Sequence, residues 1–147
     1  MSGFEFRETM SGSYHLLDRP DEERPFSFSV RARSVPWLRF LREPLADIEG
    51  EVDAEGFADH RALRGTMLLD LVRARRLGYR FDFADNEGKR RVFRGEKRVE
   101  LTRLAHTMTT LPGAIEDEGG REVGRVLVRF DARSDLLQFL RSFRAQR

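Results

Sequence analysis

Apolar and polar residues alternate with a period of two over much of this chain, and this pattern limits what it can fold into. Residues 26–33 show it most regularly, because four apolar side chains alternate there with serines and arginines. Successive side chains of a β-strand point to opposite faces, so the segment predicts a strand with one apolar and one solvated face. The other segments that predict strands are residues 4–16, 48–52, 63–71, 79–83, 89–100, 114–118 and 122–130.

Turn residues separate these segments at short intervals. The clearest turn covers residues 85–88 (DNEG), because asparagine and glycine tolerate the positive φ angles of tight hairpins. The glycine pair at residues 119–120 predicts a second hairpin. About eight strands that follow one another with short turns favour an antiparallel, up-and-down order.

Three segments depart from the strand period and predict short helices. Residues 36–42 begin with proline, and residues 101–111 place apolar side chains at helical spacing before a Pro-Gly pair ends them. Ser134 can cap a last helix that has an apolar stripe. We therefore expect one mainly β domain over residues 1–147. It would be an antiparallel up-and-down β-barrel or strongly curved sheet, lipocalin-like or calycin-like, with two or three short helices.

Glycines lie inside several of the predicted strands. Such glycines predict bulges or corners that bend a sheet toward closure, and they can also mark places where a ligand approaches the backbone. The glycines concerned are Gly12, Gly50, Gly65, Gly95 and Gly124.

The composition narrows the functional classes. The absence of cysteine excludes disulfides, thiolate metal sites and a thiol nucleophile. The 27 basic and 25 acidic residues give a net charge of only +2 and are interleaved along the sequence, so we expect no nucleic-acid partner. The first residues lack the features of a signal peptide, and no apolar run approaches the roughly 18 residues of a membrane span. We expect a cytoplasmic protein that does not span a membrane, and the sequence leaves its oligomeric state open.

No group of residues predicts a catalytic centre, a cofactor or a metal site. The histidines lie far apart and have no spacing for shared metal coordination; they are His15, His60 and His106. Glu8 lies on the face of its predicted strand that otherwise carries apolar side chains. It is therefore a candidate polar group inside a cavity or the partner of an inward arginine. An enzyme alternative would use Glu8, Tyr14 or Asp70 as acid–base groups.

Phenylalanine is the main oddity of the composition, with 12 residues. Many of them lie on the apolar face of predicted strands. In a small barrel, such side chains either fill the core or line a ligand pocket. Both alternatives stay open at this point. The residues predicted to line a pocket for a hydrophobic ligand are Phe6, Glu8, Tyr14, Phe28, Met67, Tyr79, Phe81, Phe83 and Phe130.

Surface features raise a third alternative, a protein–protein interaction module. Residues 37–41 (WLRFL) and the predicted C-terminal helix are candidate docking sites. Basic runs at residues 73–76 and 89–91 could meet an anionic partner, although a solvated barrel end explains them more simply.

Two stretches carry a family resemblance. They are residues 6–12 (FRETMSG) and the long hairpin that joins residues 79–83 (YRFDF) to residues 95–99 (GEKRV). Together they resemble the β-rich accessory domain found beside glucose–methanol–choline-type oxidoreductases, including cholesterol-oxidase-like proteins. The resemblance implies an auxiliary domain that acts on or near lipid-like substrates beside a flavin oxidoreductase, and it carries over no catalytic residue. We therefore expect a non-enzymatic binding or accessory domain for a hydrophobic, lipid-like small molecule.

Overall fold

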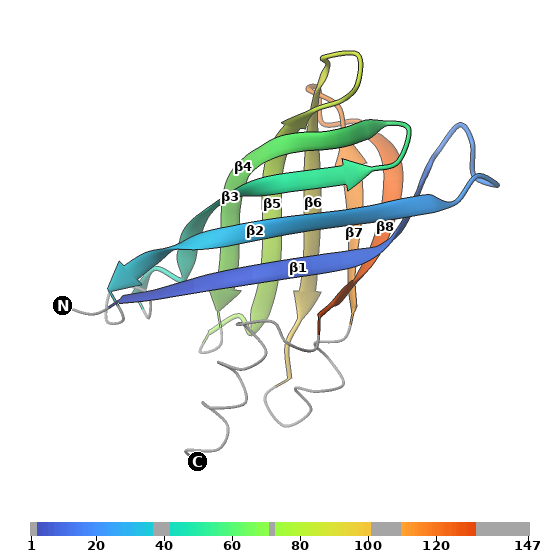
Figure 1. Cartoon of the computed structure of the whole chain (residues 1–147). Coiled ribbons are helices and arrows are strands. Elements are labelled where there is room, and N and C mark those ends of the chain that lie inside the picture. The colour runs from blue at the N-terminus through green and yellow to red at the C-terminus, as the bar shows by residue number, and fades with distance from the viewer. Residues whose placement is uncertain (1–2, 37–41, 71–72, 101–109, 132–147) are drawn as a thin grey trace.

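The computed structural model describes residues 3–36, 42–70, 73–100 and 110–131. Eight strands in these residues form one closed antiparallel barrel (Figure 1). Each strand pairs with the next one along the chain, and β8 pairs with β1 to close the barrel. The predicted up-and-down barrel is therefore confirmed. The strands are β1 (Gly3–Leu16), β2 (Arg24–Pro36), β3 (Leu45–Ala54), β4 (Ala58–Asp70), β5 (Arg76–Ala84), β6 (Arg90–Arg98), β7 (Thr110–Glu116) and β8 (Glu122–Phe130).

The predicted helices fall mainly outside the described residues. This applies to residues 37–41, to residues 101–109 and to the helix expected after Ser134. The end of the second prediction is wrong, because Leu111 lies in β7 and pairs with Val128 of β8. Leu111 fits a helical spacing and a strand parity equally well, and its pairing with a distant strand decides between them.

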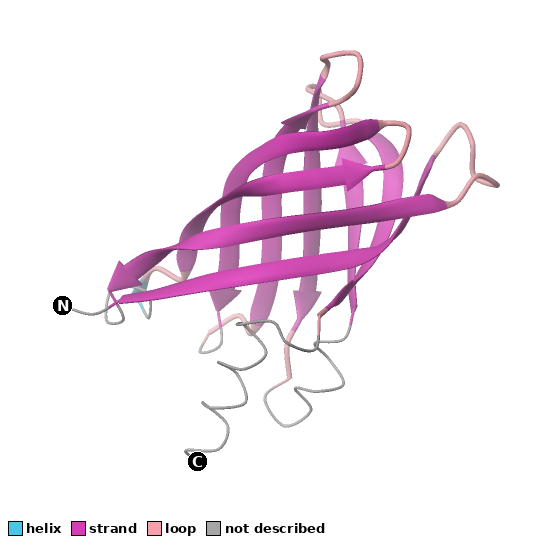
Figure 2. Ribbon diagram, in the orientation of Figure 1, coloured by secondary structure: helices cyan, strands magenta, loops and turns pink. Residues whose placement is uncertain are grey.

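The strand alternation places one apolar face of each strand inside the barrel, as β2 illustrates. Phe26, Phe28 and Val30 are buried, whereas Ser29 and Arg31 between and beside them are exposed. Figure 2 shows that strands make up nearly all of the described chain, so the barrel wall consists of such alternating segments. The core is the space that this wall encloses, and apolar side chains fill it.

Aromatic rings pack against one another in the middle of the barrel. The rings of Phe81 and Phe93 stack with their centroids 4.9 Å apart, and the Phe28 ring lies 5.1 Å from Phe81 and 5.4 Å from Phe93. Phe26 joins the cluster at 5.8 Å from Phe93. Such ring pairs stabilise a core by about 0.5–1.5 kcal/mol beyond the burial of their area. For these four residues, the structure shows ring-on-ring packing.

Glycines let neighbouring strands of the barrel wall approach closely at three positions. A Cβ atom at Gly50 would overlap the carbonyl oxygen of Ser29 on β2, and Gly12 and Gly65 are in the same situation against their neighbouring strands. The prediction of bulges holds only for Gly124, which adjoins a register shift between β7 and β8. At the other four glycines the strand pairs keep their register, so of the two predicted alternatives, a bulge or a corner, the bulge is excluded there.

The two ends of the barrel differ in their connections. At the hairpin end, short turns join β1 to β2, β3 to β4, β5 to β6 and β7 to β8 (Figure 1). At the opposite end, which we call the far end, the strands lead into residues that the structure does not describe.

Two hairpin turns are built in the same way around an aspartate. The Asp85 carboxylate accepts the N–H groups of Glu87 and Lys89 at 2.9 and 2.8 Å, and Gly88 adopts a φ of 82°. In the other turn, the Asp117 carboxylate accepts backbone N–H groups at 3.0 and 2.9 Å, followed by a glycine with the same φ. Both predicted hairpins are confirmed, and an aspartate acceptor with a left-handed glycine explains each turn.

Candidate functional site

Two polar side chains lie buried among the apolar residues of the barrel interior. Glu8 on β1 is 3% exposed and Tyr79 on β5 is 1% exposed. Strands β1 and β5 are four places apart in the ring of eight, so the two side chains point inward from opposite walls. Burial, and then the negative charge of Glu8, raise the pKa of Tyr79 well above its usual value. Tyr79 is therefore a neutral hydroxyl in a water-poor site that is within reach of the charge of Glu8.

The Tyr79 hydroxyl has no hydrogen-bond partner among the described residues. Leaving a buried polar group without a partner costs about 1–3 kcal/mol, and folded proteins contain few such groups. This hydroxyl can both donate and accept a hydrogen bond. It is therefore the interior group best placed to meet the polar atom of a bound molecule.

Lys97 adds a third polar group to the same end of the interior. It shares the parity of the inward residues Phe93 and Gly95 on β6, is half-buried, and lies close to the far end of its strand. Its ammonium group donates to the carbonyl oxygen of Thr110 at 2.6 Å, and burial lowers the pKa of that group. Sequence reasoning did not select Lys97 as a site residue. Lys97 follows the inward Gly95 by two residues, and this spacing was the signal that could have identified Lys97 as an inward residue.

The residues predicted to line a pocket all lie inside the barrel, but not at one level. Phe6, Glu8 and Phe130 lie toward the far end, whereas Tyr14 and Phe83 lie toward the hairpin end. The remaining four are Phe28, Met67, Tyr79 and Phe81. Their inward direction is confirmed, and their contact with a ligand stays a prediction.

Side-chain packing closes the hairpin end of the interior. The Tyr14 hydroxyl donates to the carbonyl oxygen of Glu55 at 2.5 Å, and its ring lies 6.3 Å from that of Phe57. The Arg91 guanidinium lies 5.4 Å from the Phe57 ring centre and pairs with Asp85 at 3.0 Å. Outside this layer, the turns surround a depression of about 720 Å³ whose lining carries both signs of charge. This layer of side chains separates Tyr79 from the hairpin end of the barrel.

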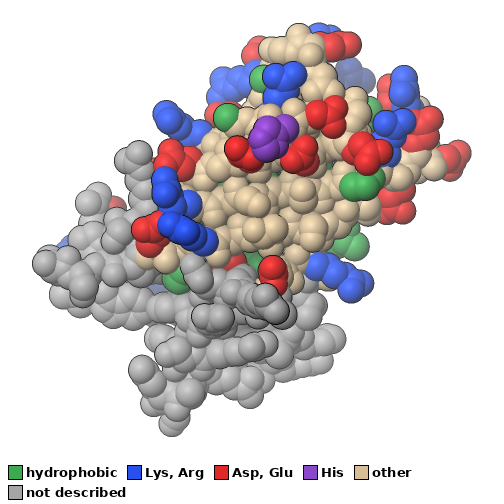
Figure 3. All heavy atoms as spheres, in the orientation of Figure 1, with side chains coloured by type: hydrophobic (Ala, Val, Ile, Leu, Met, Phe, Trp, Pro, Cys, Tyr) green, Lys and Arg blue, Asp and Glu red, His purple; other side chains and the backbone are tan. Residues whose placement is uncertain are grey.

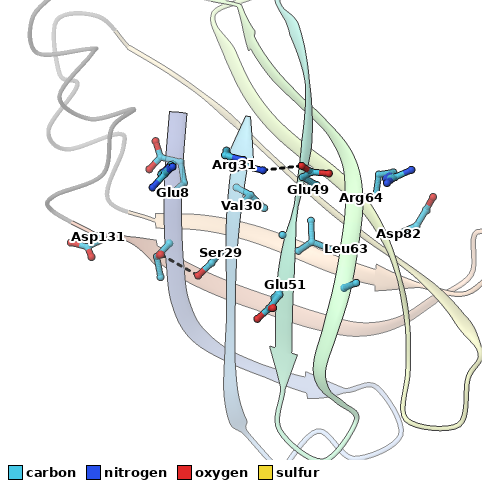
Figure 4. Close-up of a pocket in the computed structure, with 14 residues that line it drawn as sticks. Glu8, Ser29, Val30, Arg31, Glu49, Glu51, Leu63, Arg64, Asp82 and Asp131 are labelled. Atoms are coloured by element: carbon cyan, nitrogen blue, oxygen red, sulfur yellow. Dashed lines mark hydrogen bonds and ion pairs between the residues drawn. The ribbon is translucent and has the colours of Figure 1, made fainter. Parts of the chain in front are cut away.

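A larger groove, of about 1080 Å³, lies on the outside of the barrel across β1 to β4 (Figure 4). Half of its lining residues are outward charged side chains of both signs, and Arg31 pairs with Glu49 at 3.2 Å within it. Thr9 and Ser29 are hydrogen-bonded to each other at 3.1 Å on its floor. The groove can make polar contacts, and its charged walls do not match a lipid-like ligand.

The three groups of the enzyme alternative are not brought together. Tyr14 is engaged at the hairpin end, and Asp70 accepts the N–H groups of Arg73 and Ala74 at 2.9 and 3.2 Å in the turn that follows β4. Only Glu8 of this set lies among the polar groups near Tyr79. Tyr14 and Asp70 make hydrogen bonds elsewhere in the barrel, so the three residues do not form a shared acid–base site.

The described histidines lie on the outer surface. His15 alternates with the inward Tyr14, and the His60 ring is 3.3 Å from a Glu51 oxygen and 3.7 Å from an Asp53 oxygen. His106 lies outside the described residues. In the part of the chain that the structure describes, no group of three or more histidine, aspartate or glutamate side chains is arranged to hold a metal ion.

Comparisons with known proteins add no information about the site. No family model, curated protein or solved structure matches this chain. Among the described residues, no helix is long and apolar enough to cross a membrane.

Proposed function

We propose that this protein is a non-enzymatic binding domain that takes a hydrophobic, lipid-like small molecule into the far end of its barrel. The observation that carries the proposal is the Tyr79 hydroxyl, which is buried, feels the negative charge of Glu8 and has no hydrogen-bond partner among the described residues. A ligand that supplies this partner would remove the cost of the unpaired hydroxyl, so binding would gain more than the hydrogen bond alone provides.

The surroundings of Tyr79 indicate the chemistry of the ligand. A neutral hydroxyl group can accept a hydrogen bond from Tyr79 and donate one to a carboxyl group, whereas a carboxylate would be repelled by an ionised Glu8. The far end of the interior is lined by buried apolar side chains, and the remainder of the molecule would pack against them; they include Phe6, Leu69, Leu77 and Phe130. The proposed ligand is therefore an apolar molecule with an uncharged hydrogen-bonding head group.

The solid aromatic centre limits how far the ligand penetrates. The rings of Phe28, Phe81 and Phe93 pack against one another, and the Phe28 ring also packs against that of Tyr79. The molecule would therefore occupy the interior between these rings and the far end. The expected flavin oxidoreductase partner stays a prediction that rests on the resemblance of residues 6–12, 79–83 and 95–99.

Native mass spectrometry after incubation with a lipid extract tests the proposal. We expect the full chain to retain a neutral lipid-like molecule, and the Tyr79→Phe variant to retain several-fold less of it. The matched control is Tyr14→Phe, because Tyr14 is the only other tyrosine and its hydroxyl already has a protein partner. Absence of any retained molecule, or equal loss in both variants, would contradict the proposal.

A further inference from the structure

Although acidic and basic residues are interleaved along the sequence, the fold gathers several residues of like sign on the outer side of particular strands. The outward residues of β3 are all acidic from Asp47 to Asp53, and we call Asp47, Glu49, Glu51 and Asp53 the β3 acidic face. Figure 3 shows acidic side chains gathered around a histidine on the side of the molecule that carries β2, β3 and β4. The small net charge of +2 therefore hides a polar distribution of charge.

A face of the opposite sign lies on β5 and β6. Its outward residues Arg76 and Arg98 are direct partners in the strand register, as are Arg80 and Arg94, and we call these four residues the β5–β6 arginine face. Like charges directly opposite one another in a sheet are destabilising. Two such pairs on one face favour an anionic partner that offsets the repulsion.

The acids near the β5–β6 arginine face do not satisfy it. Arg76 pairs with Glu96 at 2.7 Å, and Arg94 lies 3.8 Å from a Glu116 oxygen. Arg80 and Arg98 form no ion pair with any other residue that the structure describes. All four arginines are exposed, so their guanidinium groups can reach carboxylates of another molecule in two-pronged geometry.

The β3 acidic face is also incompletely matched. Glu49 pairs with Arg31 at 3.2 Å, and Glu51 and Asp53 share the exposed ring of His60. Asp47 makes no ion pair with the described residues. The face therefore keeps a surplus of negative charge that a cationic surface can meet.

The two faces match in spacing as well as in sign. Outward residues four positions apart on a strand lie about 13–14 Å from each other. This is the separation of Asp47 from Glu51, and also of Arg76 from Arg80 and of Arg94 from Arg98. Two carboxylates of one strand can therefore meet two arginines of another at the same time.

We propose that copies of this chain associate head to tail, with the β3 acidic face of one copy against the β5–β6 arginine face of the next. A second copy satisfies both surfaces at once, whereas a polyanion would satisfy only the arginine face. The contact joins two different faces, so it can repeat and form short chains of copies. It would be governed by exposed charges and hence would weaken as salt screens them.

Sedimentation velocity of the full chain tests the salt dependence. In about 10 mM salt, where charges act over about 30 Å, we expect the average mass to rise with protein concentration to at least about twice that of the monomer. In about 1 M salt, where the screening length is about 3 Å, we expect the monomer alone. A protein that stays monomeric in low salt overturns the proposal, whether or not it binds a heparin column.

A charge-swap experiment tests the identity of the faces. The Asp47→Arg/Glu51→Arg variant cancels the negative charge of its β3 acidic face, and the Arg80→Glu/Arg94→Glu variant cancels the positive charge of its β5–β6 arginine face, so neither should associate alone. Mixed together, they should form complexes again. The Lys89→Glu/Arg121→Glu control changes charge as much as the second variant but lies in the hairpin turns, so it should associate like the wild type. Failure of the mixture, with both variants folded by circular dichroism, or loss of association in the control overturns the proposal.

Discussion

Glu8 and Tyr79 point into the barrel from opposite walls, and the negative charge of Glu8 adds to burial in keeping the Tyr79 hydroxyl protonated. A tyrosine in the unfolded chain ionises near its ordinary pKa of 10.0, whereas Tyr79 in the folded protein does not. Above pH 10 the unfolded chain therefore loses a proton that the native state keeps, and the free energy of unfolding falls as pH rises.

This relationship predicts the alkaline stability of the protein. Tyr79→Phe should unfold at a higher pH than the wild type, because phenylalanine removes the ionisation that favours the unfolded chain. The measurement is unfolding by circular dichroism from pH 9 upward, with tyrosinate absorbance recorded in parallel. Tyrosinate that forms at both tyrosines before the barrel unfolds would contradict the prediction.

The same substitution should separate stability from binding at neutral pH. Tyr79→Phe removes a buried hydroxyl without a partner among the described residues, so we expect it to raise the free energy of unfolding by about 1 kcal/mol. Tyr14→Phe breaks the hydrogen bond to Glu55 and should lower it by a similar amount. Urea unfolding of the two variants measures both changes, and a loss of stability in Tyr79→Phe would show that its hydroxyl is satisfied.

The paired hairpin turns allow the Asp85–Arg91 ion pair to be measured. Asp85→Ala removes the acceptor of two backbone N–H groups and leaves the half-buried Arg91 without its carboxylate, so we expect a loss of about 3–5 kcal/mol. Asp117→Ala removes an equivalent turn acceptor that pairs with no arginine in the part of the chain that the structure describes, and should cost about 1 kcal/mol. Equal losses in denaturant unfolding would rule out a contribution of the ion pair.

The close approach of β2 and β3 at Gly50 predicts intolerance of a single methyl group. Gly50→Ala should destabilise the barrel by about 1–3 kcal/mol or more, because the new Cβ atom meets the Ser29 carbonyl oxygen. Gly119→Ala is the control, since its Cβ atom would lie at an ordinary contact distance of 3.5 Å from an Asp117 carboxylate oxygen in an exposed turn. Thermal unfolding should show little change for the control, and a tolerated alanine at position 50 would contradict this account of the close approach.

The sequence predicted the strands and both hairpins because local information determines them. Alternation identifies inward residues such as Phe28, and the DNEG turn identifies where a strand reverses. Closure depends on the pairing of β1 with β8, which lie far apart in the chain, so no local pattern distinguished a barrel from a curved sheet. Leu111 shows the same limit, since only its distant partner makes it a strand residue.

The sequence predicted part of the candidate site, because strand alternation shows which residues point inward. Parity alone placed Glu8 and Tyr79 inside, and both are buried there. Lys97 was missed because it lies in a charged run, where its inward parity is hidden by the exposed Glu96 and Arg98 beside it. The charged faces were missed because strands that are adjacent in space, not in sequence, bring Arg80 opposite Arg94.

The most direct test of ligand binding near Tyr79 uses the two tyrosines as reporters. In protein labelled only at tyrosine, the ring signals of Tyr14 and Tyr79 can be assigned with the Tyr14→Phe variant and followed by NMR during titration with dodecan-1-ol. We predict that the Tyr79 signal shifts and saturates while the Tyr14 signal stays unchanged, because a ligand from the far end meets Tyr79 and the aromatic centre shields Tyr14. An unchanged Tyr79 signal at saturating alcohol, or a shift confined to Tyr14, would contradict the proposed site.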